Sequence, residues 1–384
     1  MNWKKGILAA GIGLHATAAW CLNGAEMTGY GAAMGMGGAS IANPQDTLTG
    51  ASNPANMAFL GNQWDLDVAI FDGTSSSTYL LPSNSIHQNI VTAAPNFGVN
   101  YHLSPDWTIG ISSIAGGAGV NYDMAAFPLP GAPNAKNSVA AMRVVNSLTY
   151  KPVENLALGV GLVLGYQTWK SEGLIVPGPT GTPTLLPSHG FAQAFGIGMS
   201  AGVTWRPNDW LMLGASYMSK THTSRPHGYS DDLLSTVGGH ADLPASFGLG
   251  FAIRPTPTVT VAGDWKQIRW ADSPAFGTLF GWKNQNVLRA GVAWDATPAL
   301  TLRAGISHGS ELVPSDAIAR NVYSPGINTL AYTLGVSYDW KDVGRFSLNY
   351  EYDPTKTVVG TGLSTGSSIS VHLQVLSLGF QRRF

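Results

Sequence analysis

Apolar side chains alternate with small or polar ones along fourteen stretches of the chain. In residues 156–167 the even positions carry Leu, Val or Tyr, whereas the odd positions are mainly Ala and Gly. Residues 246–253, 300–307 and 346–353 repeat this pattern. Side chains of a strand point alternately to its two faces, so a period of two predicts β-strands with one apolar face.

Short and long connectors alternate between these stretches. Pro, Asp and Asn, which favour tight turns, recur in six short connectors at 104–106, 151–154, 206–209, 254–257, 295–298 and 341–344. The long connectors are rich in Gly, Pro and Ser and span 72–94, 116–137, 171–189, 222–237, 271–283, 309–328 and 356–367. Membrane barrels have short periplasmic turns, longer outer loops and an even number of strands. We therefore predict an all-β fold, a 14-stranded antiparallel transmembrane β-barrel over residues 63–384 with long extracellular loops.

Aromatic residues lie beside the short turns. Trp and Tyr favour a membrane interface, because one end of the ring is apolar and the other forms hydrogen bonds. These residues predict an aromatic girdle at the periplasmic rim, made of Tyr101, Trp107, Tyr150, Trp205, Trp210, Trp294, Tyr338 and Trp340.

Composition supports a membrane protein that crosses with strands. Only 11% of the 384 residues are charged, against about 25% in soluble domains. No run reaches the roughly 18 apolar residues of a membrane helix, and the other spanning structure open to a chain is a closed barrel. The sequence also lacks a basic stripe, so we expect no nucleic-acid partner.

The two ends suggest export. Residues 1–19 combine Lys4 and Lys5, an apolar stretch and the motif Ala16-Thr17-Ala18, which predicts a cleaved signal peptide, with a short first helix as the alternative. The single cysteine leaves no intrachain disulfide. Phe384 ends an alternating stretch, which resembles the C-terminal signal that the barrel assembly machinery recognises. We expect a multi-pass protein of the bacterial outer membrane.

A glycine-rich segment, residues 20–62, precedes the first strand. It contains in order Gly35-Met36-Gly37-Gly38-Ala39, Asn43-Pro44-Gln45-Asp46 and Asn53-Pro54-Ala55. Together with the stretches at 242–250, 264–270, 288–292 and 302–305, these motifs resemble the FadL/TodX family of outer-membrane transporters for long-chain fatty acids and other hydrophobic compounds.

The resemblance implies a mechanism. Residues 20–62 would form a hatch that plugs the lumen and is gated through Asn53, Pro54 and Ala55. Ligand would pass from an outer groove in the loops into a pocket, and a shift of the hatch would release it. A kink in the third strand would then open the wall sideways. Glycine often marks such a bend, and the candidates are Gly110, Gly116 and Gly117, with Gly119 nearby.

The inward positions are mostly Gly, Ala, Ser and Thr, which favours a narrow conduit over a wet pore. A fatty-acid carboxylate in such a lumen needs a cation or donors as partner. The candidates are Arg143, Lys266, Arg289 and Arg303. Alternatively, these cations pair with inward acids and brace the hatch, and the acids are Asp65, Asp67, Asp264 and Glu351.

The long loops carry apolar residues that soluble loops avoid. Exposed apolar patches usually mark binding sites, and the resemblance places the outer groove at 116–137 and 171–189. Its candidate residues are Phe127, Leu129, Leu174, Ile175, Leu185 and Leu186. The alternative is that these loops only pack on each other over the barrel.

We expect passive uptake of long-chain fatty acids or other hydrophobic molecules, without a cofactor, by a monomer surrounded by outer-membrane lipid and lipopolysaccharide. The alternatives are a general porin for small polar solutes and a lipid-modifying barrel enzyme. No nucleophile elbow, meaning a G-x-S-x-G run on a strand-to-helix turn, supports an enzyme, and neither an H-E-x-x-H nor a paired-Cys motif is present. We predict no metal site, although His222, His227, Asp231 and Asp232 offer a weak ligand set.

Overall fold

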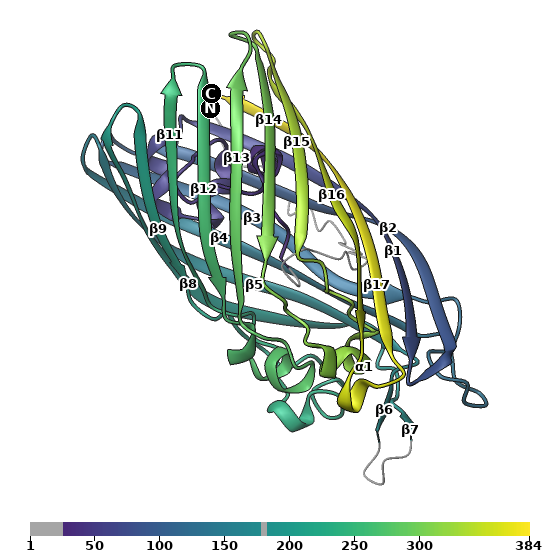
Figure 1. The fold of residues 1–384 in the computed structure, drawn as a ribbon. Coiled ribbons are helices and arrows are strands. Elements are labelled where there is room, and N and C mark those ends of the chain that lie inside the picture. Colours follow the sequence, from purple (N-terminus) through teal and green to yellow (C-terminus); the bar gives the residue numbers. More distant parts are fainter. Residues whose placement is uncertain (1–25, 178–182) are drawn as a thin grey trace, which may run out of the picture.

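The computed structural model describes residues 26–177 and 183–384, so the predicted signal peptide lies outside the described residues. Fourteen antiparallel strands form a closed barrel, as predicted (Figure 1). Each strand pairs with its neighbours along the chain, and β1 pairs with β17 to close the wall. None of the described helices is both long enough and apolar enough to cross a membrane.

The barrel strands vary widely in length. Their bounds are β1 Gln63–Tyr79, β2 Leu81–His102, β3 Trp107–Asn121, β4 Lys136–Val153, β5 Leu156–Glu172, β8 Ala192–Asn208, β9 Leu211–Met218, β11 Ser246–Thr256, β12 Val259–Ile268, β13 Gln285–Asp295, β14 Leu300–Gly309, β15 Leu330–Trp340, β16 Gly344–Val359 and β17 Ser368–Arg383.

The alternation in the sequence becomes an alternation of exposure. On β5, Leu158, Val160, Leu162 and Leu164 are exposed on the outer surface, while the residues between them face the lumen and are buried. The apolar positions of β11, β14 and β16 likewise include exposed residues such as Phe247, Leu302 and Phe346. An apolar outer face is what lipid requires of a barrel, so the predicted strand faces are correct.

The short turns gather at one end of the barrel, beside the C-terminus (Figure 1). All eight residues of the predicted aromatic girdle are exposed there on the outer surface. Trp107 and Tyr150 stack with ring centroids 4.7 Å apart, which ties β3 to β4 at the rim. This end is the periplasmic end of the predicted topology.

Two predicted loop boundaries are wrong. Residues 72–94 are not a long loop but the outer parts of β1 and β2, which meet at Leu80 with a φ of 60°. Ser, Asn and Pro have low strand propensity, yet Ser75, Ser77 and Ile86 continue the alternation of buried positions. The loop predicted at 116–137 is also shorter, because β3 runs to Asn121 and β4 begins at Lys136.

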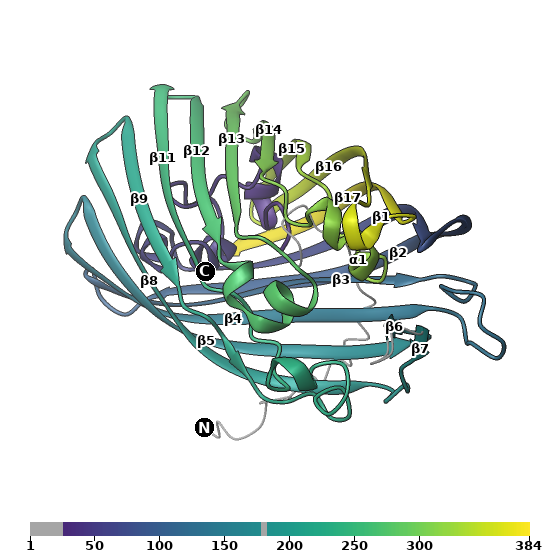
Figure 2. The same cartoon turned by 60° about the horizontal axis from the view of Figure 1, so that its bottom comes forward.

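The long connectors fold into a cap over the opposite end (Figure 2). Trp270, Phe276 and Trp282 form its aromatic centre, with ring centroids 4.9–5.0 Å apart. The cap contains short elements: β6 Ile175–Pro177, β7 Pro183–Leu185, η4 Ser235–Val237, η5 Trp270–Asp272, η6 Ala275–Leu279, η7 Ser315–Ala317, α1 Ile318–Asn321 and η8 Gly362–Ser364. The two-residue strand β10 His222–Thr223 pairs with β8 in the wall.

Candidate ligand site between plug and wall

Residues 26–62, hereafter the plug, lie inside the ring of strands (Figure 2). Three short 3-10 helices make up its centre: η1 Gly31–Met36, η2 Thr47–Ala51 and η3 Pro54–Phe59. Such short helices gain little from their own hydrogen bonds. The plug therefore depends on contacts with the wall.

Asn53 supplies the side-chain hydrogen bonds of the predicted gating motif. Its Oδ1 caps η3 by accepting from the N–H of Ala55 at 3.0 Å. Its Nδ2 donates to the carbonyl of Ile41 at 2.8 Å and, on β8, to Val203 O and Thr204 Oγ1. One fully buried amide thus joins two plug segments to the wall.

Glycines in the wall make room for this motif. A Cβ added at Gly159 would overlap the backbone of Pro54 and Ala55, and one at Gly202 would overlap the side chain of Asn53. Thr149 donates to the carbonyl of Pro54 at 2.8 Å from the next strand. The glycines on the inward face of β5 and β8 therefore allow the plug to touch the wall.

Carboxylates hold the rest of the plug. Asp264 Oδ2 on β12 accepts from the N–H groups of Ser40 and Ile41 at 2.7 and 3.0 Å. Asp46, within the plug, accepts from the N–H of Ala32 at 2.7 Å. Burial, followed by the nearby carboxylate of Asp65, raises the pKa of Asp46 to about 7.

Glu26 links two of the four predicted lumen cations. Its Oε1 accepts from Arg143 on β4 and its Oε2 accepts from Lys266 on β12, both at 2.6 Å. The three side chains are only 9%, 6% and 21% exposed, respectively. Burial alone would raise the pKa of Glu26, but Lys266 and Arg143 outweigh it and lower the pKa to about 2. The carboxylate is therefore ionised.

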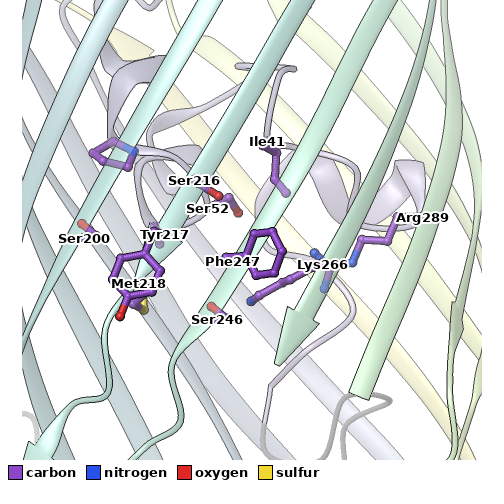
Figure 3. A pocket seen from close by; sticks show the side chains of 12 residues that line it. Ile41, Ser52, Ser200, Ser216, Tyr217, Met218, Ser246, Phe247, Lys266 and Arg289 are labelled. Atoms are coloured by element: carbon purple, nitrogen blue, oxygen red, sulfur yellow. The ribbon is translucent and has the colours of Figure 1, made fainter. Parts of the chain in front are cut away.

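Arg289 on β13 is the third cation of this region. It is buried, and its Nε has no hydrogen-bond partner among the described residues. The side chains of Lys266 and Arg289 line a pocket together with the buried residues Ile41, Met218 and Ser246 (Figure 3). The cavity measures about 20 Å³, room for about one water molecule, so the site is closed by the plug.

Arg303 does not join this group. Its Nε donates to Gln45 Oε1 of the plug at 2.8 Å, and its Nη1 donates to Ser337 on β15 at 2.6 Å. The structure thus brings together Arg143, Lys266 and Arg289 and assigns Arg303 to bracing the plug. Glu26, the counter-ion of Arg143 and Lys266, was missed, since the four acids named from sequence did not include it. The segment that carries Glu26 has no strand period, so no signal in the sequence marks its position.

The wall has a seam between β2 and β3. These strands pair only from Phe97↔Ser113 to His102↔Thr108, whereas β3 stays paired with β4 up to Asn121. Beyond Ser113, side chains of β2 bridge the gap: Asn96 Oδ1 accepts from the N–H of Ala115 at 2.9 Å, and Gln88 Oε1 accepts from the N–H of Asn121.

The sequence of β2 and β3 fits this seam. Pro95 has no N–H to donate, and proline in a sheet is confined to strands that lack a partner on one side. Gly116 and Gly117 lie within β3 at the seam, so their predicted position in the loop after the strand is wrong. Gly117 also touches β4, because an added Cβ would lie 2.6 Å from the carbonyl oxygen of Val139. Gly110 lies in the paired part instead, against Met57 of the plug.

The apolar loop candidates mostly pack together. Leu174 and Ile175 are buried, and Phe127, Leu129 and Leu186 pack against the same cluster, which continues into the outer lumen. Leu185 is 40% exposed. The packing predicted as the alternative is thus present, and a groove at this place requires these side chains to separate.

The weak metal-ligand set is not brought together. His222 contacts Asp242 at 3.1 Å, while Asp232 contacts His189 at 2.7 Å. Residues 26–177 and 183–384 contain no group of three or more His, Cys, Asp or Glu side chains that would hold a metal ion.

Comparison with known proteins identifies a family with this architecture. The model of the family "Outer membrane protein transport protein (OMPP1/FadL/TodX)" matches residues 8–379. A comparison with curated proteins gives no significant match.

Solved structures share the fold. The P. putida toluene transporter TodX has a TM-score of 0.72 at 20% identity, covering 93% of this chain and 99% of its own. A Pseudomonas aeruginosa FadL homologue gives 0.70 at 16% identity, covering 93% and 98%. The Ralstonia pickettii toluene transporter TbuX gives 0.65 at 16% identity, covering 93% and 99%. With the family model covering nearly the whole chain, the protein belongs to the OMPP1/FadL/TodX family of outer-membrane transport proteins.

Proposed function

We propose that this protein takes up long-chain fatty acids or other hydrophobic molecules by passive diffusion through a plug-gated conduit that opens sideways. The observation that carries the proposal is the group of lumen cations, the buried Arg143 and Arg289 and the half-buried Lys266, beside apolar side chains in a closed lumen. A carboxylate needs such cations to leave water, and its alkyl chain needs the apolar surroundings.

The proposed path follows the described features in order. Ligand enters through a groove formed when the cap residues around Leu174 and Ile175 separate. It reaches the cation group once the plug shifts at Asn53, Pro54 and Ala55. It leaves through the seam between β2 and β3, with Gly116 and Gly117 as the flexible positions. Burial of apolar surface, about 25 cal/mol per Å², drives transfer without a cofactor.

Neutral aromatic hydrocarbons are the second ligand class. Two of the solved structures that share the fold are named as toluene transporters. Such ligands require apolar surface but no cation. A general porin is disfavoured, because a porin lumen is a water-filled channel and here the plug fills it. We assign the protein no catalytic role.

We also propose a route by which the protein reaches the outer membrane. We expect residues 1–19 to be removed on export, and the barrel assembly machinery to insert the protein as a monomer among outer-membrane lipid and lipopolysaccharide. The exposed apolar face of the strands supports insertion in lipid.

Uptake by cells with and without the protein tests this function. A labelled long-chain fatty acid, toluene and a small sugar are compared. Fatty-acid uptake that depends on the protein supports the proposal, and toluene uptake alone favours the second ligand class. Sugar uptake alone means a wet lumen and contradicts a hydrophobic conduit.

A further inference from the structure

Glu26 presents to the lumen cations the same chemical group that a fatty acid carries. Each of its two oxygens accepts from a different cation at 2.6 Å, Arg143 on β4 and Lys266 on β12. These strands lie far apart in the chain, and in the described structure Glu26 is what connects the two cations. The plug thus supplies its own carboxylate to the two cations that a fatty-acid carboxylate would bind.

We propose that Glu26 is an internal substitute for the ligand, and that a hydrophobic molecule opens the plug only if its own carboxylate displaces Glu26. This inference rests on the proposed function and adds a selection rule to it. The substrate class becomes long-chain carboxylates, and neutral hydrocarbons of similar size are excluded from this route.

Arg289 provides the first docking point. Glu26 pairs with Arg143 and Lys266, whereas Arg289 lines the same pocket as Lys266 and makes no ion pair within 4.0 Å in the described part of the chain. The acids that feel its charge, Asp264 and Glu351, already accept hydrogen bonds from the plug. An incoming carboxylate can therefore pair with Arg289 before Glu26 leaves.

The exchange conserves the charge of the site. When a ligand carboxylate replaces Glu26, Arg143 and Lys266 keep an anionic partner throughout. When a neutral ligand displaces Glu26, the buried Arg143 and the half-buried Lys266 lose their counter-ion, and removing one partner of a buried ion pair is strongly unfavourable. The site therefore selects ligands by the charge of their head group and not by their hydrophobicity.

Release of Glu26 also frees the start of the plug. The next wall contact is Thr28, whose hydroxyl donates to Glu351 on β16 at 2.6 Å. Asn53 and Asp46, which hold the later plug helices, are not part of the exchange. The expected motion is local to residues 26–31 and does not require the whole plug to leave the barrel.

Binding to the purified full chain in a non-ionic detergent tests the exchange. The probes are a radiolabelled long-chain carboxylate and the alcohol of equal length. Glu26→Gln removes the competing charge, so we expect it to bind the carboxylate at least about tenfold more tightly, since hydrogen bonds to charged groups contribute about 1.5–3 kcal/mol. Its affinity for the alcohol stays unchanged.

Asp46→Asn is the matched control. Asp46 is another buried plug carboxylate, but it accepts only from plug backbone groups and faces none of the three cations in an ion pair. We expect this variant to change both affinities by the same factor. If Glu26→Gln also changes both affinities equally, or changes neither while both probes bind, the exchange is refuted.

Hydrogen exchange on the wild-type protein tests the idea without a variant that must fold. The carboxylate should accelerate exchange in residues 26–31, and the alcohol should not; equal effects of the two probes contradict the inference. If the full-chain protein binds neither probe, the proposed function itself fails. Binding of neither probe thus contradicts the proposed function, whereas equal binding of both probes contradicts only the exchange at Glu26.

Discussion

At the scale of single residues, a few buried side chains hold the plug. Asn53 connects two plug segments to β8, and Asp264 binds two successive plug amides from β12. Each group is buried, so loss of one partner leaves another polar atom unsatisfied. Small changes at these positions therefore act on the plug and leave the strand ladders intact.

Asn53→Ala should weaken the plug by about 2–4 kcal/mol, because it removes an N-cap and the hydrogen bonds of the two amide N–H groups, about 1 kcal/mol each, which three acceptors share. We expect faster hydrogen exchange in η3 and impaired fatty-acid uptake, and a further Pro54→Ala change should enlarge both effects. Heat-resistant migration in gels should remain, as the barrel stays folded. The exposed Asn155→Ala in a periplasmic turn is the control; normal uptake by the Asn53 variant would count against gating by the plug.

The plug should loosen as pH rises, because Asp46 is held protonated. Its pKa is raised from 3.8 to about 7 by burial and by Asp65, with Asp67 and Arg345 also near. The closed plug therefore binds the proton more strongly than the open plug. The resulting stabilisation is complete below pH 3.8 and is lost as pH rises through about 7.

The difference between 3.8 and about 7 corresponds to about 4 kcal/mol. Hydrogen exchange of plug amides, corrected for the intrinsic rate, should show about 3 kcal/mol of this stabilisation lost between pH 5 and pH 8. Asp46→Asn should abolish the pH dependence. A wild-type plug that is equally protected at both pH values would show that Asp46 does not control closure.

The site was only partly predictable from single residues. The inward cations follow from the strand period, since Arg143, Lys266 and Arg289 occupy lumen positions of recognisable strands. The position of Glu26 cannot be predicted in this way, because the plug sequence shows no regular period. Its position depends on contacts with strands more than a hundred residues away. Tertiary contacts alone decide which cations a loop acid meets.

At the scale of elements, each strand has one face for lipid and one for the plug. β5 shows the division, with exposed Leu residues outside and Gly159 against the plug inside. The period of two predicted these faces. Strand ends were harder, as β1 and β2 extend beyond the region where lipid demands apolar side chains, and Ser-rich strands there resemble loops.

Leu162→Arg should hinder assembly, because it places a charge on the lipid face of β5. We expect a cost of about 2–4 kcal/mol near the midplane and about 0–1 kcal/mol for Leu158→Arg closer to the interface. Both side chains are 46% exposed in the folded barrel, which makes the pair a control for depth. The fraction of heat-resistant protein in gels measures it; equal fractions would mean that the faces or depths of β5 are wrong.

The seam between β2 and β3 should control exit. Asn96→Cys with Ala115→Cys, joined by a short thiol cross-linker, closes the part bridged only by side chains. We expect fatty-acid uptake to fall and a reducible cross-linker to allow recovery. Phe97→Cys with Ser113→Cys joins positions that are already paired and should leave uptake unchanged. Equal uptake with both cross-links would exclude exit at this seam.

At the scale of the whole molecule, the wall and the plug are separable structures. The wall closes through sixteen paired positions between β1 and β17 and does not need the plug for its ladders. The plug, in contrast, receives polar contacts from strands all around the barrel, among them β4, β8, β12, β14 and β16.

Deletion of residues 26–62 should leave a barrel that assembles and conducts ions. The lumen would then be open, and its inward positions are small or polar. Planar-bilayer recordings should show a large, steady conductance for the deletion variant and little for the full chain. A folded deletion variant without conductance would mean that the cap, and not the plug, closes the lumen.

The pairing of the first and last strands also dictates an order of events during folding. Gln63 pairs with Arg383, so the final ladder joins the two ends of the barrel sequence and carries the largest loop-closure entropy. The plug precedes β1 in the chain and is surrounded by the strands. Its polar contacts come from β4, β8, β12, β14 and β16, so they are complete only when this last ladder has brought both halves of the sheet around it. Docking of the plug is therefore expected to finish together with closure of the wall.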